Sequence, residues 1–450
     1  MKILFISLGC DKNLVDTEMM LGTLVQRGFS ITDDETEAEA VVVNTCCFIN
    51  DAKQESINTL LEMAELRKDG DIKALIAAGC LAQRYQDEIQ REIPEVDAIV
   101  GTTAIDAIAD ALEEVLSGQE RNHLEDISGM PSLYDRSAQH KRIVTTGGHY
   151  AYLKIAEGCD KYCSYCIIPK VRGRYRSIPL EELVEEAERL AAFGAKEIIL
   201  VAQETTVYGM DLYGEKRLPE LLRRLCAISG VYWIRILYCY PEEITDELIE
   251  TIRTEEKVCN YLDIPIQHAS DHVLKRMGRR TDRREIMDMI ARLRERIPDI
   301  CLRTTIITGF PGETQKDHES LLEFVDEMAF DRLGVFTYSP EEDTPAALFE
   351  GQIDEAVKVE RQADIMELQQ EIAFEKAQDA VGSTLLVMVE GKVPDEHAYV
   401  ARSYKDAPNV DGFVFIQTAR ELMTGDFVRV KITGSYDYDL IGEIEDEFAK

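Results

Sequence analysis

Three closely spaced cysteines are the residues of this chain best suited to hold a metal cluster. Cys159, Cys163 and Cys166 lie in the stretch EGCDKYCSYCIIPK, residues 157–170, with a C-x3-C-x2-C spacing. Thiolate is the usual protein ligand of iron-sulfur clusters, so this loop can hold three irons of a 4Fe-4S cube and leave the last iron without a protein ligand. A structural zinc site is the alternative, but it needs four ligands, commonly in two pairs, and only one C-x2-C pair is present.

A second set of cysteines follows predicted strands. Cys10, Cys46 and Cys80 are spaced by about one strand-helix unit, and each closes a short apolar run typical of a buried parallel strand. The three runs are residues 2–10, 38–47 and 72–80. Because parallel strands joined by crossovers share one carboxyl edge, we expect the three thiols to converge there and to hold a second cluster with an open iron that can bind a sulfur. Ordinary burial of free cysteine is the alternative.

The remaining cysteines and the histidines carry weaker signals. We assign these cysteines to packing: Cys47, Cys226, Cys239, Cys259 and Cys301. His268 and His272 are four residues apart, and a solvent-facing helix start explains them as well as a ligand pair does. Trp233 is expected in a core.

Length and composition favour a large globular protein. A chain of 450 residues with 45% hydrophobic residues predicts two or three domains with real cores. The first residues show no secretion signal and no membrane span, so a cytoplasmic location is expected, where eleven cysteines serve metal binding or catalysis better than disulfides. The net charge of −35 favours a basic protein partner over a phosphate backbone, unless acidity serves only solubility.

Four segments can be delimited. Residues 1–115 alternate strands and helices and are predicted to form a parallel α/β domain with a three-cysteine site, and residues 116–149 are polar and weakly periodic, as in a linker. Residues 150–375 repeat the alternation and predict a partial (β/α) barrel whose chemistry lies at the carboxyl ends of its strands. Residues 376–450 contain five short predicted strands, a small antiparallel barrel with 8 Lys plus Arg against 14 Asp plus Glu.

The C-x3-C-x2-C loop resembles the signature of radical S-adenosylmethionine enzymes, with aromatic Tyr165 before the last cysteine. The resemblance implies that the methionine part of S-adenosylmethionine chelates the open iron and that a 5′-deoxyadenosyl radical forms. It places Tyr165, Gln203, Gln267 and Gly309 near this cofactor. The alternatives are packing for Tyr165 and an ordinary turn for Gly309.

The first domain, the partial barrel and the terminal barrel together resemble the methylthiotransferases, whose members carry two 4Fe-4S clusters, and the terminal barrel resembles a TRAM domain. The stretches SLGCDKNLVDTE and ARSYKDAPNVDGFVFI are similar to the RimO type, except that Asp11 stands where proline is expected. The resemblance implies methylthiolation of the β-carbon of an aspartate in the twelfth protein of the small ribosomal subunit, with an external electron donor and sulfur source.

Two other functions compete with this interpretation. A tRNA adenosine methylthiotransferase would share the cysteine triads, but an acidic enzyme with an acidic terminal barrel is steered toward a basic protein and away from RNA. RNA contact is therefore not favoured. A non-enzymatic binding module would leave both triads unexplained.

Overall fold

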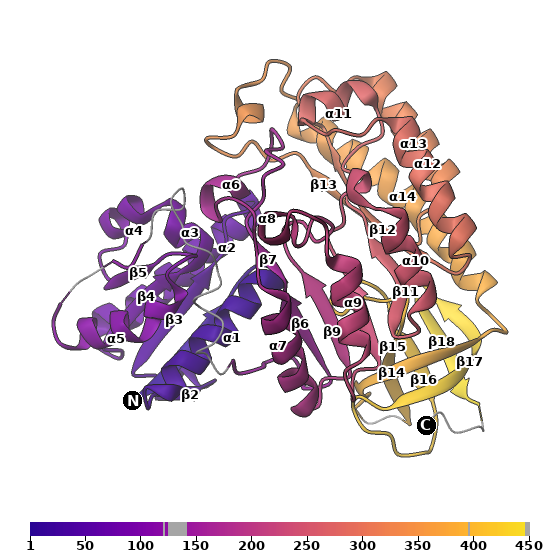
Figure 1. Cartoon of the computed structure of the whole chain (residues 1–450). Helices are drawn as coiled ribbons and strands as arrows, with labels where there is room; N and C mark the ends of the chain where they lie inside the picture. The colour runs from indigo at the N-terminus through magenta and orange to yellow at the C-terminus, as the bar shows by residue number, and fades with distance from the viewer. Residues whose placement is uncertain (120–121, 125–141, 395–396, 446–450) are drawn as a thin grey trace.

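Three sheets organise the chain (Figure 1). The computed structural model describes residues 1–119, 122–124, 142–394 and 397–445. The predicted linker, residues 116–149, therefore lies largely outside the described residues. None of the helices in the described part combines the length and the apolar character needed to span a bilayer.

The first sheet is parallel and has the order β2-β1-β3-β4-β5. Its strands are β1 (Lys2–Ser7), β2 (Ser30–Thr32), β3 (Ala40–Thr45), β4 (Ala74–Ala78) and β5 (Ala98–Val100). Its helices are α1 (Asp11–Gln26), α2 (Asn50–Asp69), α3 (Gly79–Arg84), α4 (Gln86–Glu92) and α5 (Ile108–Leu116). Every residue of β3 and β4 is buried because both faces of the sheet pack against other elements, which explains why their sequences are continuous apolar runs.

The strand order reverses between β1 and β3. Helix α1 leads from β1 to the outer strand β2, and the chain then returns to β3 on the other side of β1. Open α/β sheets bind ligands outside the carboxyl ends of their strands at such a reversal. Cys10 follows β1 and Cys46 follows β3, so two cysteines of the first set stand at this point.

The central sheet is parallel and open, with the order β13-β12-β11-β10-β9-β6. Its strands are β6 (Tyr150–Lys154), β9 (Glu197–Val201), β10 (Trp233–Ile236), β11 (Val258–Asp263), β12 (Cys301–Thr308) and β13 (Arg332–Thr337). A short hairpin, β7 (Ala156–Glu157) with β8 (Arg176–Ser177), follows β6. The predicted partial barrel is confirmed, and it has six parallel strands.

Helices cover the outer face of the central sheet. The main ones are α7 (Leu180–Ala192), α9 (Leu218–Cys226), α10 (Asp246–Thr254), α12 (Arg283–Arg296), α13 (Gln315–Met328) and α14 (Glu355–Asp379). Shorter helices are α6 (Ile168–Val171), α8 (Met210–Tyr213) and α11 (Asp271–Met277). Side chains alternate across each strand. Ile198 and Leu200 of β9 therefore pack against the helices, whereas Ile199 faces the other way.

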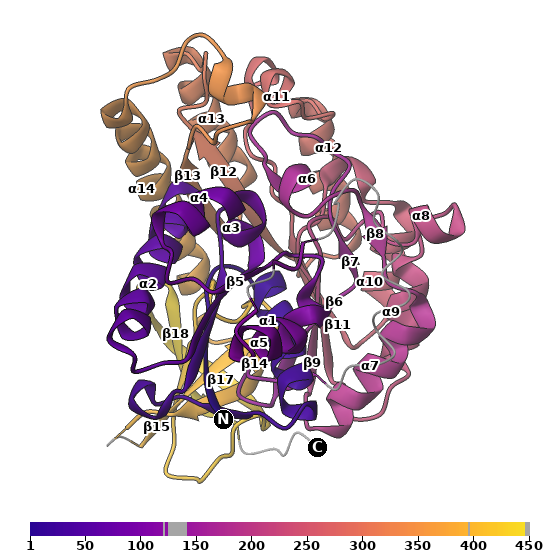
Figure 2. The ribbon, with the colours of Figure 1, turned by 90° about the vertical axis from the view of Figure 1, so that its left-hand side faces the viewer.

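The inner face is closed at the start of its strands by α1 and by the C-terminal barrel. Tyr150, Trp233 and Cys301, each the first residue of its strand, share one apolar cluster with Val15 of α1 and Met388 of the barrel. Trp233 is buried there, as predicted. In Figures 1 and 2 the barrel lies at one end of the molecule, below the central sheet. The opposite end of the inner face, at the carboxyl ends of the strands, is left for a site.

The C-terminal barrel is closed and has five strands in the order β14-β15-β16-β18-β17. They are β14 (Thr384–Lys392), β15 (Ala398–Ser403), β16 (Val414–Gln417), β17 (Phe427–Tyr436) and β18 (Asp439–Ile444). Neighbouring strands run antiparallel except for β16 and β18, which are parallel. Val387, Val430 and Ile416 meet in its core, since alternate residues point inward.

Candidate cluster and cofactor site

The three cysteines that follow β1, β3 and β4 lie together at the carboxyl edge of the first sheet. Cys10 precedes the first turn of α1, Cys46 follows β3 directly, and Cys80 is the second residue of α3. Gly9 has φ +88°, and a Cβ there would lie 2.8 Å from the sulfur of Cys46. Only glycine allows this approach of the β1 loop to Cys46.

The effects of these thiols on one another's pKa values are also those of neighbouring groups. Burial raises the pKa of Cys80, the nearby guanidinium of Arg172 lowers it, and the thiols of Cys47, Cys46 and Cys10 raise it further. Burial likewise raises the pKa of Cys46, with Cys10 adding to the effect. Because iron binds thiolate, a cation beside Cys80 favours the form that a cluster needs.

The second triad occupies the loop between β7 and α6. Cys159 and Cys163 are buried, and Cys166 is half-buried. The loop is held by backbone hydrogen bonds from Cys159 to Gly173 O (3.2 Å) and from Cys166 to Cys163 O (3.0 Å). Burial raises the pKa of Cys159 to about 12, and the neighbouring thiol of Cys163 also raises it. The structure thus brings the three predicted ligands into one loop facing the central sheet.

No three His, Cys, Asp or Glu side chains in the described ranges converge closely enough to bind a single metal ion. A cube differs from a single ion because each thiolate binds a separate iron, so its ligands stand farther apart. The donor set of each triad, three thiols and no fourth protein ligand in the motif, fits a cube with one open iron.

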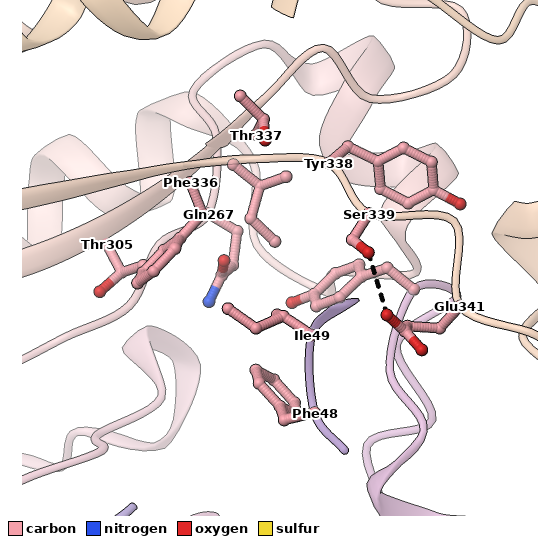
Figure 3. A pocket seen from close by; sticks show the side chains of 11 residues that line it. Phe48, Ile49, Gln267, Thr305, Phe336, Thr337, Tyr338, Ser339 and Glu341 are labelled. Carbon is pink, nitrogen blue, oxygen red and sulfur yellow. Dashed lines mark hydrogen bonds between the residues drawn. The ribbon is translucent and has the colours of Figure 1, made fainter. Parts of the chain in front are cut away.

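A cavity of about 190 Å³ lies at the carboxyl ends of the central strands, lined in part by residues that neighbour Cys46 and Cys166 in sequence (Figure 3). Phe48 and Ile49, just after Cys46, form one wall, and Tyr165, just before Cys166, forms another. The remaining lining comes from the carboxyl ends of the central strands: Gln267, Thr305, Ile307, Phe336, Thr337, Tyr338, Ser339 and Glu341. Both cysteine loops therefore contribute to one largely apolar pocket.

The rim of this cavity is closed by ion pairs between the first domain and the central sheet. Glu341 lies 3.2 Å from both Lys53 of α2 and Arg84 of α3, and it accepts a hydrogen bond from Ser339 (2.9 Å; Figure 3). Arg84 also donates to the carbonyl oxygen of Glu342 (2.6 Å). These contacts hold the Phe48 wall against the strand ends.

Two of the residues predicted to contact the cofactor line the cavity, and two do not. Tyr165 and Gln267 face it, whereas Gln203 and Gly309 lie outside its lining. Gln267 has φ +72°, a strained value for a residue with a side chain, and its Oε1 is buried without a partner. Gln203 donates to Glu157 (2.7 Å), and its Oε1 is likewise unpaired. Unpaired buried acceptors at this edge suit a polar ligand.

Arg279 adds a buried cation that the sequence analysis did not single out. Its guanidinium lies 4.1 Å from the ring centre of Tyr240 and donates to Pro265 O (2.8 Å), while Nε and Nη1 have no partner. The nearby groups Tyr165, Tyr240 and Cys163 raise its pKa against the opposing effect of burial. A buried guanidinium with free donors beside the cysteine loop fits the carboxylate of S-adenosylmethionine.

A buried network of charges joins the two domains beside Cys80, and sequence reasoning missed it. Arg172 donates to Cys80 Sγ (3.3 Å), Asp16 (2.5 Å), Glu157 (3.1 Å) and Asn13 (2.9 Å). Lys154 pairs with both Asp16 and Glu157. The only signal in the sequence is that charged residues flank the cysteine loop on both sides, at 157 and 172.

Asp11, the departure from the expected proline, is also engaged. Its carboxylate accepts from the hydroxyl of Tyr238 (3.1 Å) and pairs with Lys12 (3.0 Å), whose ammonium lies 3.2 Å from the ring centre of Tyr238. Tyr238 follows β10, so Asp11 ties the Cys10 loop to the central sheet.

The other predictions about cysteine and histidine have mixed outcomes. The cysteines assigned to packing do pack: Cys47, Cys239, Cys259 and Cys301 are buried, and Cys226 is half-buried. His272 is exposed as expected. The prediction for His268 is wrong, because it lies before the helix start and is completely buried, where its Nδ1 accepts from Ser270 N (2.9 Å). Burial lowers the pKa of His268 to about 3.

Three family descriptions match successive parts of the chain. Residues 2–101 match the Uncharacterized protein family UPF0004, residues 153–325 match the Radical SAM superfamily, and residues 381–444 match the TRAM domain. These spans coincide with the first sheet, most of the central sheet and the terminal barrel.

Similar proteins of known family extend over the full length. The chain is 61% identical over 445 residues to a ribosomal protein uS12 methylthiotransferase RimO from Lachnoclostridium phytofermentans, covering 99% of this chain and 100% of that protein. It is 51% identical to proteins of the same description from Acetivibrio thermocellus, with 100% and 99% coverage, and from Geobacter sulfurreducens, with 98% of each.

A solved structure supports the fold. The radical S-adenosylmethionine methyltransferase TsrM from Kitasatospora setae, with cobalamin and a 4Fe-4S cluster bound, aligns with a TM-score of 0.55 over 94% of this chain and 83% of that one, at 14% identity. That likeness shows a shared arrangement of the α/β and radical domains only. By its full-length relatives, the chain belongs to the RimO family of methylthiotransferases.

Proposed function

We propose that this protein transfers a methylthio group to the β-carbon of an aspartate in ribosomal protein uS12, using two 4Fe-4S clusters and S-adenosylmethionine. The observation that carries the proposal is the cavity bounded by Phe48 and Ile49 after Cys46 and by Tyr165 before Cys166. A substrate side chain in this pocket would touch both cysteine loops at once. The relatives described above are named as methylthiotransferases of ribosomal protein uS12, which supports the proposed substrate.

Each triad has a separate part in this proposal. Cys159, Cys163 and Cys166 would hold the cluster that binds S-adenosylmethionine, and Cys10, Cys46 and Cys80 would hold the second cluster. When bound, the first cluster and its cofactor would supply the one-electron chemistry that opens a C–H bond, and the open iron of the second cluster would hold the sulfur taken from an external source.

The side chains of the cavity would then orient the reactants and exclude water. Arg279 would bind the carboxylate of S-adenosylmethionine, and Tyr165 and Gln267 would lie beside its adenosine. Gln203 and Gly309 remain predictions, since neither lines the cavity. Phe48 and Phe336 would keep water from the reacting carbon, which protects a reactive site from side reactions.

The domain limits that we propose are residues 1–115 for the first domain, 116–149 for a linker, 150–375 for the radical core and 376–450 for the TRAM-like barrel. The last boundary falls in the final turn of α14, which precedes β14. We also propose a cytoplasmic location, a basic ribosomal protein as partner, free or on the ribosome, and an external electron donor and sulfur source.

The experiment measures iron and product together. Anaerobic reconstitution should load about eight irons per chain, and replacing either triad with alanine should leave about half. Cys226→Ala is the matched control, because this half-buried cysteine lies outside both triads. After incubation with S-adenosylmethionine, sulfide and a reductant, mass spectrometry of uS12 should show one methylthio group on an aspartate.

A tRNA substrate is the competing outcome. Parallel incubation with tRNA should give no methylthio-adenosine, since a chain of net charge −35 repels a phosphate backbone. Modified tRNA with unmodified uS12 would reverse the substrate assignment, and a single cluster per chain would refute methylthiolation.

A further inference from the structure

We propose that Arg172 is a positioning residue for the cluster held by Cys10, Cys46 and Cys80: a directed hydrogen bond from its guanidinium to Cys80 favours the reduced state of that cluster. The inference rests on the proposed function, because it requires a cluster on this triad. Arg172 itself lies between α6 and β8, just after the loop that carries Cys159, Cys163 and Cys166.

The hydrogen bonds of the two Nη groups of Arg172 fix the direction in which its Nε–H group points. Nη1 donates to Asp16 and Glu157, and Nη2 donates to Asn13. A guanidinium is planar, so fixing both Nη groups also fixes Nε, which points to the sulfur of Cys80 at 3.3 Å. The side chain is only 2% exposed, and water therefore has little access with which to compete for these bonds.

The charges around Arg172 are balanced. Two cations, Arg172 and Lys154, face two carboxylates, Asp16 and Glu157. A buried set of this kind brings no excess positive charge to the thiol. The effect on Cys80 therefore comes from the aimed N–H group more than from net charge.

Hydrogen bonds to the sulfurs of an iron-sulfur cluster help to set its reduction potential. Reduction adds negative charge to the cluster and its thiolates, so a donor at Cys80 stabilises the reduced state more than the oxidised state. A hydrogen bond from a charged donor is also about twice as strong as one between neutral groups.

Arg235, another buried arginine, directs its donors to oxygen instead. Arg235, which is completely buried, donates to Glu197 (2.7 Å) and to the carbonyl oxygen of Tyr404 (2.6 Å). Arg172 resembles it in burial and in ion pairing, and differs in placing Nε against a cysteine sulfur. This contrast makes Arg235 a control for the loss of a buried guanidinium.

The same network also reaches the radical core. Glu157 accepts from Arg172 with Oε2 and from Gln203 with Oε1 (2.7 Å). A chain of hydrogen bonds thus runs from Cys80 through Arg172 and Glu157 to the end of β9. Arg172 consequently links the orientation of Cys80 to the position of the central sheet.

The test uses the full-length chain with Cys159, Cys163 and Cys166 replaced by alanine, so that only the other cluster contributes. Reduction is followed by paramagnetic resonance during an anaerobic redox titration. The decisive variant is Asp16→Asn with Arg172→Met, which removes the donor and keeps the network neutral. At the unmodified midpoint potential, we expect at least a tenfold fall in the ratio of reduced to oxidised cluster, about 59 mV for one electron.

Arg235→Lys in the same background should keep the original potential. An unchanged potential in the fully loaded double variant would overturn the proposal. If that variant binds no iron, Arg172→Lys decides by the same criterion, because lysine keeps the charge but cannot meet four partners in one plane. Absence of iron from the unsubstituted background would refute the cluster assignment instead.

Discussion

Glu197 provides a sharp test of how the barrel is held to the central sheet. This first residue of β9 is completely buried between two guanidiniums. Its Oε1 accepts from Arg235 of β10 (2.7 Å), and its Oε2 accepts from Arg402 of β15 in the barrel (2.8 Å). The substitution Glu197→Gln keeps the shape and removes the only negative charge that these two contacts share.

The magnitude follows from burial. Removing one partner of a buried ion pair costs about 3–5 kcal/mol, because the remaining charge stays in a low-dielectric interior. The exposed pair Arg223–Glu247 is the matched comparison, with side chains 47% and 61% exposed. Pairs of this kind contribute about 0–1 kcal/mol, so Glu247→Gln should have a small effect.

Trp233 makes the measurement direct. It is the single tryptophan of the chain, and its ring packs edge-on against the ring of Phe427 of the barrel, with 4.8 Å between the ring centres. Urea unfolding followed by its fluorescence reports on this junction. Glu197→Gln should lower the urea midpoint far more than Glu247→Gln, and equal midpoints for the two variants would show that the buried charge does not hold the barrel.

The pH dependence supplies an independent check. Burial tends to raise the pKa of Glu197, but Arg402 and Arg235 together hold it below its ordinary value. The folded chain thus binds fewer protons than the unfolded chain near the unfolded pKa of about 4.3. The stability from Glu197 is present above that pH and is lost as the pH falls through the lower, folded pKa. The Gln variant should lack this contribution.

Three further outcomes are expected. Gly309→Ala should lower the melting temperature by more than Gly382→Ala, because both have a left-handed backbone but only the Cβ at 309 would clash, at 2.3 Å from Cγ of Lys358; equal losses would exclude the clash as the cause. His268→Gln should lose less stability than the unsubstituted chain as the pH falls from about 6.5 to 3. Burial lowers the pKa of folded His268 to about 3, so in this range protons bind the unfolded chain and shift the equilibrium toward it; unaltered acid sensitivity in chemical denaturation would contradict this. Gln267→Ala should weaken binding of S-adenosylmethionine to the reconstituted protein by about tenfold in equilibrium dialysis, the effect of one lost hydrogen bond, and undiminished binding would remove Gln267 from the site.

Patterns within single elements explain why the fold was predictable. The runs at β3 and β4 are apolar throughout because both faces of the sheet are covered, and the sequence alone therefore indicates parallel strands. The strands β2 and β5 have three residues each, too short for any pattern, and no strand was assigned to either. The strands β16 and β18 pair in parallel because the barrel closes, and the sequence of neither strand alone predicts this pairing.

The cysteines were predictable for a different reason. Their type restricts the chemistry, and their place after successive parallel strands restricts their position to one edge. The side chains that support them carry no such restriction. Asp16 lies on a helix of the first domain, whereas Lys154 and Arg172 belong to the second, and in sequence each is indistinguishable from a surface charge.

The same limit explains the error at His268 and why the contact of Asp11 with Tyr238 was not predicted. A histidine near a helix start is exposed or buried according to which sheet lies behind it, and the sequence does not state where Glu313 and Arg361 will pack. Asp11 stands beside Cys10 in sequence, yet its partner Tyr238 is more than two hundred residues away. Contacts between domains decide what these polar residues do, and such contacts also hold Phe48 and Tyr165, which neighbour the two cysteine triads in sequence, at one cavity.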